Sequence, residues 1–222
     1  MVTIGASPGP SSRRLRGVGH AGGMVADSRT PATAPAPRHA FGSYRVCLVC
    51  LGNICRSPMA EVVLRAQLDR VGLADRVEVD SAGTGNWHEG EPMDETASDV
   101  LARRGYDGAG HRARQIQPSW FGRYDLIAAM DEANLQRLRA MAPDPDDADR
   151  IVLFTRFDPD RAGRGNRRDA GIPDPYGEGA DQFALVFDLI LGASRGLADQ
   201  LAALLGGRPA SSARVSPDPA GD

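Results

Sequence analysis

Short apolar runs alternate with helical patterns along most of this 222-residue chain, and this alternation constrains the fold more than any other feature. We expect buried strands over 45–50, 77–80, 126–130 and 151–154. The helices expected between and after them cover 58–71, 93–104, 132–141 and 182–204. Strands that alternate with helices imply right-handed crossovers, so the sequence predicts an α/β fold with a parallel sheet and helices on both faces.

The two ends of the chain differ in composition from this alternating unit. Residues 1–43 are rich in Gly, Pro, Ser and Ala, and residues 206–222 have the same character. Neither segment has enough large apolar side chains to offset the entropy of ordering. We therefore expect one folded domain at 44–205, a disordered N-terminal extension at 1–43, and a disordered C-terminal tail at 206–222. Met24 is a second candidate for the true start of the chain.

The number and spacing of the cysteines indicate the kind of cellular compartment in which the protein works. Cys47, Cys50 and Cys55 lie within one short segment, and an odd number in a chain of this size argues against a disulfide framework. We expect a reducing, cytoplasmic compartment and a chemical role for at least one thiol. No run of about 18 apolar residues suggests a membrane span, and no secretory signal is expected. The net charge of -3 gives no nucleic-acid signature.

The segment that leaves the first expected strand combines groups that suit a phosphate site. Cys50, five residues and Arg56 lie between a buried strand and a helix N-terminus, where ligands of parallel sheets bind. Backbone N–H groups of this loop can point at phosphate oxygens, and the helix dipole helps them. The Arg56 guanidinium can hold two oxygens. Gly52 is expected to permit a backbone geometry that a side chain would obstruct. The loop residues expected to bind phosphate or substrate are Leu51, Gly52, Ile54 and Cys55.

Cys50 is the candidate nucleophile. The helix N-terminus and Arg56 favour a thiolate at this position near neutral pH, and a thiolate can attack phosphorus in line. Cys47 lies in the middle of a strand and is expected to pack in the core. Ser57 has two interpretations, as the helix N-cap before Pro58 or as a hydroxyl donor to the Cys50 thiolate, and both stay open.

The block VCLVCLGNICRSPMAE at 46–61 resembles the active-site loop of low-molecular-weight protein tyrosine phosphatases. Further blocks agree in order: VDSAGTGNWHEGEP at 79–92, HRARQI at 111–116, AAMDEANL at 128–135 and PDPYG at 173–177. The resemblance implies a four-stranded parallel sheet with the phosphate-binding loop after the first strand. It also implies hydrolysis of phosphotyrosine in protein substrates through a cysteinyl-phosphate intermediate, release of inorganic phosphate, and no metal or cofactor.

The resemblance also suggests roles for residues outside the cysteine–arginine loop. Asn53 would order the loop, and His111 would support it as a structural histidine. Trp87 and Tyr176 match positions that wall the substrate pocket, where an aromatic leaving group would stack.

Asp174 is the expected general acid and base, because one carboxyl can serve both steps of such a hydrolysis. It lies in Ile-Pro-Asp-Pro-Tyr-Gly, where two prolines stiffen the loop. Asp131, which follows the third expected strand, is the competing carboxyl and is expected to be structural.

Three alternative functions are considered. Protein-arginine phosphatases resemble the same family but place Thr where this chain has Ile54, and arsenate reductases need cysteines downstream of Cys55, where this sequence has none. A non-catalytic phosphate-binding module would have no use for both a thiolate and an aligned acid.

Redox sensitivity is also expected: a Cys50 sulfenic acid could be captured by Cys55 as a disulfide, although Cys55 could equally be a buried loop residue.

Overall fold

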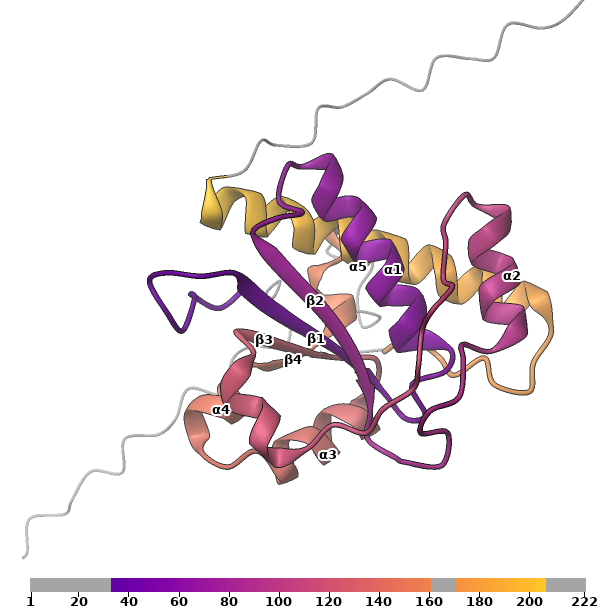
Figure 1. Cartoon of the computed structure of the whole chain (residues 1–222), viewed down its shortest axis with the longest axis horizontal. Helices are drawn as coiled ribbons and strands as arrows, with labels where there is room; N and C mark the ends of the chain where they lie inside the picture. The colour runs from indigo at the N-terminus through magenta and orange to yellow at the C-terminus, as the bar shows by residue number, and fades with distance from the viewer. Residues whose placement is uncertain (1–32, 161–170, 207–222) are drawn as a thin grey trace, which may run out of the picture.

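The computed structural model describes residues 33–160 and 171–206, and its centre is a four-stranded parallel sheet with strand order β2-β1-β3-β4 (Figure 1). The strands are β1 (Tyr44–Cys50), β2 (Val77–Gly83), β3 (Leu126–Ala129) and β4 (Ile151–Leu153). The predicted α/β fold is therefore confirmed. Because β1 pairs with both β2 and β3, it is an inner strand. Its last residue, Cys50, therefore lies between its neighbours at the end of the sheet where the carboxyl ends of the strands meet.

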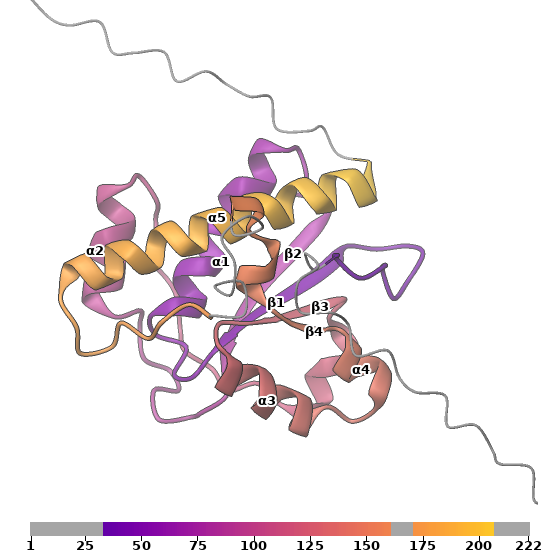
Figure 2. The same ribbon diagram turned by 180° about the vertical axis from the view of Figure 1, so that it is seen from behind.

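Helices cover both faces of this sheet (Figures 1 and 2). One face packs against α1 (Arg56–Arg70) and α5 (Ala180–Leu205), with α2 (Glu95–Arg103) beside them, and the other packs against α3 (Glu132–Met141). Alternate residues of β1 point to the two faces, as a pleated strand requires. Val46 and Leu48 join the core under α1 and α5, whereas Cys47 and Val49 join the core under α3. Cys47 is core packing, as predicted.

Helix α1 begins at Arg56, two residues before the predicted start. Pro58 lies in its first turn, where backbone N–H groups have no partner within the helix, so the missing N–H of proline costs no hydrogen bond. Cys55 precedes the helix and makes no side-chain cap. The N-terminus of α1 therefore remains suited to bind an anion.

Three short helical segments were not predicted. They are η1 (Pro118–Arg123), α4 (Pro145–Asp149) and η2 (Phe154–Phe157), and each has only four to six residues, too few to show a helical period. The strand expected over 151–154 ends one residue early, because Phe154 starts η2.

The structure differs from the prediction of disorder for residues 33–43, which pack against the folded unit. Ala34 is buried, and its N–H donates to the side chain of Gln200 in α5 at 3.0 Å. Arg38 forms an ion pair with Asp147 and donates its backbone N–H to Asp125 at 2.5 Å. Composition did not reveal this segment because polar contacts, rather than large apolar side chains, hold it.

The expected disorder of residues 1–32 and 207–222 falls outside the described residues. In the described ranges, no helix combines the length and the apolar character that a membrane span requires.

Candidate active site

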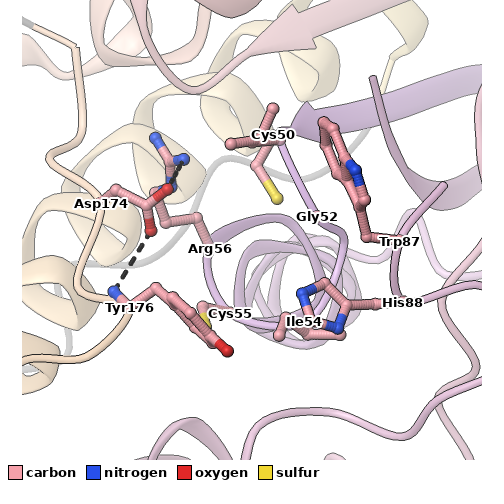
Figure 3. Close-up of a pocket in the computed structure, with 10 residues that line it drawn as sticks. Cys50, Gly52, Ile54, Cys55, Arg56, Trp87, His88, Asp174 and Tyr176 are labelled. Carbon is pink, nitrogen blue, oxygen red and sulfur yellow. Dashed lines mark hydrogen bonds and ion pairs between the residues drawn. The ribbon is translucent and has the colours of Figure 1, made fainter. Parts of the chain in front are cut away.

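A cavity of about 150 Å³ opens at the end of β1 (Figure 3). Three segments that are distant in the sequence line it: the loop from β1 to α1, the loop after β2, and the segment before α5. The lining residues are Cys50, Leu51, Gly52, Ile54, Cys55, Arg56, Trp87, His88, Asp174 and Tyr176. All of them except His88 were proposed from the sequence, so the fold brings the expected residues into one place.

The sulfur of Cys50 is surrounded by hydrogen-bonding groups although the residue is only 2% exposed. The backbone N–H of Asn53 donates to Sγ at 3.2 Å, and the Ser57 hydroxyl lies 3.0 Å from it. The same hydroxyl can also donate to the Ala82 carbonyl, at 3.2 Å. Since a hydroxyl has one hydrogen, it can turn from Ala82 to the sulfur when Cys50 loses its proton.

Ser57 is the second residue of α1, so the N-cap interpretation is wrong and Cys55 occupies that place. The hydroxyl instead contacts the sulfur of Cys50 and accepts a hydrogen bond from the side-chain amide of Asn53 at 2.9 Å. This geometry fits the second interpretation, in which Ser57 donates to a thiolate.

Asn53 gives the phosphate loop its shape. Its φ of 58° is in the left-handed region, and within the described ranges no other non-glycine residue has a positive φ. The buried amide donates to Ser57 and to Ser81 at 3.0 Å, and it accepts from the backbone N–H of Arg114 at 2.9 Å. His111 Nε2 lies 2.7 Å from the Asn53 carbonyl, so this nitrogen carries the hydrogen and donates it.

The left-handed residue of the loop is Asn53 and not Gly52. Space at Gly52 is tight, as expected: a Cβ there would lie 3.0 Å from the ring of His88. The constraint comes from a neighbouring loop, which the local sequence does not show.

Arg56 is buried and holds two carboxylates. Its guanidinium pairs with Asp131 at 2.5 Å and with Asp174, and it donates to the Ile172 carbonyl at 3.2 Å. Burial disfavours its charged form, but the Cys50 sulfur, Asp174 and Asp131 together outweigh burial and raise the pKa of Arg56. Its Nε has no hydrogen-bond partner among the described residues, although it is buried. A phosphate oxygen is a suitable acceptor for this group.

The two carboxylates on Arg56 differ in position. Asp131 caps α3 by accepting the Asn134 N–H at 2.7 Å and does not line the cavity. Asp174 lines the cavity, its side chain is 42% exposed, and it accepts the Tyr176 N–H at 3.3 Å (Figure 3). Of these two carboxylates, only Asp174 is therefore placed to exchange a proton with a group in the cavity.

Aromatic side chains form the rim of the cavity. Trp87 and Tyr176, which are 68% and 60% exposed, lie on opposite sides of it (Figure 3). His88 also lines the cavity, although its sequence context did not single it out. Its ring lies 5.9 Å from that of Tyr176, and its Nδ1 lies 2.7 Å from Glu91. Its position directly after Trp87 in a glycine-rich loop was the available signal.

Burial favours the neutral forms of three further groups near the site. Burial raises the pKa of the Cys55 thiol and of the Cys47 thiol, and burial lowers the pKa of His111. In residues 33–160 and 171–206, no cluster of three or more His, Cys, Asp or Glu could hold a metal ion.

Comparisons with known proteins agree with this geometry. Residues 45–205 match the family model for low molecular weight phosphotyrosine protein phosphatase. The chain is 50% identical over 155 residues to a low molecular weight protein-tyrosine-phosphatase of Streptomyces coelicolor, covering 70% of this chain and 92% of that protein. It is 41% identical over 154 residues to low molecular weight protein-tyrosine phosphatase A of Mycobacterium tuberculosis, covering 69% and 89%.

Among solved structures, a protein tyrosine phosphatase of Entamoeba histolytica with Hepes in its active site is similar. The TM-score is 0.66 and the identity is 32%, over 72% of this chain and 98% of that one.

Proposed function

The chain belongs to the low molecular weight phosphotyrosine protein phosphatase family, and from this premise we propose that it hydrolyses phosphotyrosine in proteins through a cysteinyl-phosphate on Cys50. In this proposal Arg56 binds the phosphoryl group and Asp174 is the general acid and base. The convergence of these three side chains in one cavity, from segments more than a hundred residues apart, carries the proposal.

The first step would transfer the phosphoryl group to the enzyme. A phosphate dianion engages the N–H groups of the loop and the Arg56 guanidinium, including its unpaired Nε, and takes the place of Asp174 on that guanidinium. A dianion beside Asp174 favours the protonated carboxyl, the form that a general acid needs. The Cys50 thiolate attacks phosphorus, the bond from phosphorus to the tyrosine oxygen breaks, and Asp174 protonates that oxygen.

The second step would release phosphate. The Asp174 carboxylate takes a proton from a water molecule, the water oxygen attacks phosphorus, and the phosphorus–sulfur bond breaks. Cys50 leaves as a thiolate, which Ser57 and the Asn53 N–H can stabilise at 3.0 and 3.2 Å. One carboxyl therefore serves both steps, and inorganic phosphate is the product.

The aromatic rim supports phosphotyrosine as the substrate class. Trp87 and Tyr176 face the cavity from opposite sides, so a phenyl ring above the phosphate can contact both. Ile54 lines the same cavity with an apolar side chain. Phosphoserine has no ring that could lie between these walls.

The deciding experiment compares rates on phosphotyrosine, phosphoarginine and phosphoserine versions of one peptide. We expect kcat/KM to be highest for phosphotyrosine, and Cys50→Ser to abolish turnover while still binding vanadate. Turnover by the Cys50→Ser protein would refute the mechanism, and a preference for phosphoarginine would move the chain to the arginine-phosphatase alternative.

Trp87→Ala tests the aromatic wall separately. It should reduce kcat/KM for aryl phosphates several-fold more than for small alkyl phosphates, because only the aryl group stacks. Equal losses on both would make Trp87 a structural residue.

We also propose a cytoplasmic location and redox sensitivity. The three cysteines are free thiols, as expected in a reducing compartment.

Cys50 and Cys55 line one cavity, so a sulfenic acid on Cys50 could condense with the Cys55 thiol, lose water and form a disulfide. Peroxide treatment followed by dithiol reductant should restore activity in the wild type but less in Cys55→Ser. Equal recovery, with no linked peptide by mass spectrometry, would eliminate the disulfide.

A further inference from the structure

Arg114 connects the phosphate loop to the surface of the sheet. Its backbone N–H donates to Oδ1 of Asn53 at 2.9 Å, and its carbonyl accepts the Gly83 N–H at 2.8 Å. Neither bond involves the side chain. The backbone of Arg114 therefore contacts the loop, while its side chain can bind other groups and fix the position of that backbone.

The side chain of Arg114 is held on three sides. Its Nε donates to the Ser81 carbonyl at 3.0 Å, and its Nη2 pairs with Asp80 at 2.6 Å. Asp80 also accepts the Tyr124 hydroxyl at 2.8 Å, which fixes the carboxylate from the far side. The guanidinium carbon lies 5.3 Å from the centre of the Trp120 ring, within the range of a cation–π contact.

The bond from Arg114 decides how the Asn53 amide is oriented. With Oδ1 on the Arg114 N–H, the amide nitrogen must face Ser57 and Ser81, as observed. Ser57 in turn contacts the Cys50 sulfur, which also receives the Asn53 N–H. A left-handed asparagine is uncommon and persists where its surroundings fix it.

We propose that Arg114 is a positioning residue for the nucleophile: its guanidinium, anchored on Asp80 and the Ser81 carbonyl, holds its own N–H against Asn53 and so keeps two hydrogen-bond donors on Cys50. This inference rests on the proposed role of Cys50 as the nucleophile. Arg114 touches neither substrate nor sulfur and acts only through Asn53.

Loss of the guanidinium should loosen this arrangement without unfolding the segment. Gly83 bonds to the backbone at Arg114 and at Ile116, and the Ala113 N–H donates to Glu91 at 2.9 Å. These main-chain bonds remain in any side-chain variant. A folded protein with a less well fixed Asn53 is therefore the expected product of Arg114→Ala.

The test compares Arg114→Ala with Arg112→Ala, which removes the same charge from the same segment. Arg112 is exposed, and among the described residues its guanidinium bonds only to the carbonyl of its neighbour His111. We expect Arg114→Ala to lower kcat on p-nitrophenyl phosphate about tenfold, with KM changed less than twofold, because misplacement of reacting groups mainly affects the chemical step. The pH midpoint of Cys50 alkylation by iodoacetate should move upward. Arg112→Ala should match the wild type in all three measurements.

Two more variants test the anchor of the Arg114 guanidinium directly. Arg114→Lys should recover only part of the loss, since one ammonium cannot reproduce the planar fork between Ser81 and Asp80. Asp80→Asn should move the alkylation midpoint in the same direction as Arg114→Ala, and it tests the same anchor if the alanine variant folds poorly. An Arg114→Ala protein that loses thermal stability but keeps kcat and the alkylation midpoint would overturn the inference. A Cys50→Ser protein that still turns over would instead refute the proposed function, so the two failures are distinct.

Discussion

At the scale of single residues, the reactivity proposed for Cys50 would come from its neighbours and not from exposure. Cys47, Cys50 and Cys55 are 0%, 2% and 3% exposed. Only the sulfur of Cys50 lies beside both a hydroxyl and a backbone N–H at the head of a helix. Burial raises the pKa of the other two thiols, which therefore stay protonated and weakly nucleophilic.

This contrast predicts selective alkylation. Iodoacetate at pH 7 should modify Cys50 at least tenfold faster than Cys47 or Cys55 in the folded protein, because the thiolate is the reacting form. Peptide mass spectrometry at short times measures the three rates, and inorganic phosphate should protect Cys50. Comparable labelling of Cys55 in the native protein would contradict this assignment of the reactive thiol.

The two carboxylates on Arg56 also predict different phenotypes. Asp174→Asn should lower kcat by about 10²–10⁴-fold, most strongly with poor leaving groups, because it cannot donate a proton. Asp131→Asn keeps an N-cap residue for α3 and should lose less than tenfold, since asparagine caps as well as aspartate. Steady-state kinetics on phenyl phosphates of graded leaving-group pKa separate the two. A larger loss in Asp131→Asn would reverse the assignment of the acid.

The sequence pointed to the proposed reactive residues and, through the family resemblance, to Asn53 and His111 as supports of the loop, but it did not point to Arg114 or His88. Cys50, Arg56 and Asp174 belong to motifs with recognisable chemistry. The contact of Arg114 with Asn53 spans 61 positions and that of His88 with Gly52 spans 36, and a single sequence does not show which residues meet over such distances. The left-handed conformation of Asn53 was missed for the same reason, since its partners lie on β2 and beyond it.

At the scale of elements, the segment that carries Asp174 is fastened to the end of β3. The Ile172 N–H donates to the Met130 carbonyl at 2.6 Å, and the Ile172 side chain is fully buried. Gly171 lies so close that a Cβ there would be 2.5 Å from Cα of Asp131. The proposed acid is therefore placed by a close backbone contact at the end of β3, the strand next to β1 and its loop.

This contact predicts the effect of Gly171→Ala. The clash is with backbone, so the segment must shift, and we expect unfolding to become easier by about 1–3 kcal/mol. Activity should fall about tenfold or more through displacement of Asp174. Gly122→Ala is the control, because a Cβ there meets nothing within 4 Å. Urea titration and kinetics check both effects, and wild-type activity in Gly171→Ala would show that the acid tolerates the shift.

Periodicity predicted the main elements because they are long or fully buried. All four strands and the helices α1, α2, α3 and α5 lie within a few residues of their predicted ranges. The shorter helices η1, α4 and η2 are set by tertiary packing and turn geometry, which hydrophobic periodicity does not report.

At the scale of the whole molecule, residues 33–43 brace the end of the sheet opposite the cavity. Arg38 joins the Tyr124 carbonyl, Asp125 and Asp147, and it brings together the segments before β1, β3 and β4. The carboxylate of Asp147 is nearly inaccessible to solvent, so loss of its partner leaves a poorly solvated charge.

Arg38→Ala should therefore lower the free energy of unfolding by about 2 kcal/mol, the scale of hydrogen bonds to charged groups. Activity at 25 °C should stay unchanged, because no contact of Arg38 reaches the cavity. Arg137→Ala on the exposed face of α3 is the matched control. Denaturant unfolding followed by tryptophan fluorescence measures the difference, and equal stability of the two variants would count against a bracing role.

The wide spacing of the active-site segments also determines when the enzyme becomes active during its synthesis. Cys50 and Arg56 leave the ribosome more than a hundred residues before Asp174, and α5, which covers α1, ends only at Leu205. At roughly 5–20 residues per second, the nascent chain carries an incomplete loop for several seconds or longer. During that time the chain lacks Asp174, the proposed acid. A premature stop codon between these segments should therefore yield a fragment without this carboxyl and with little phosphatase activity.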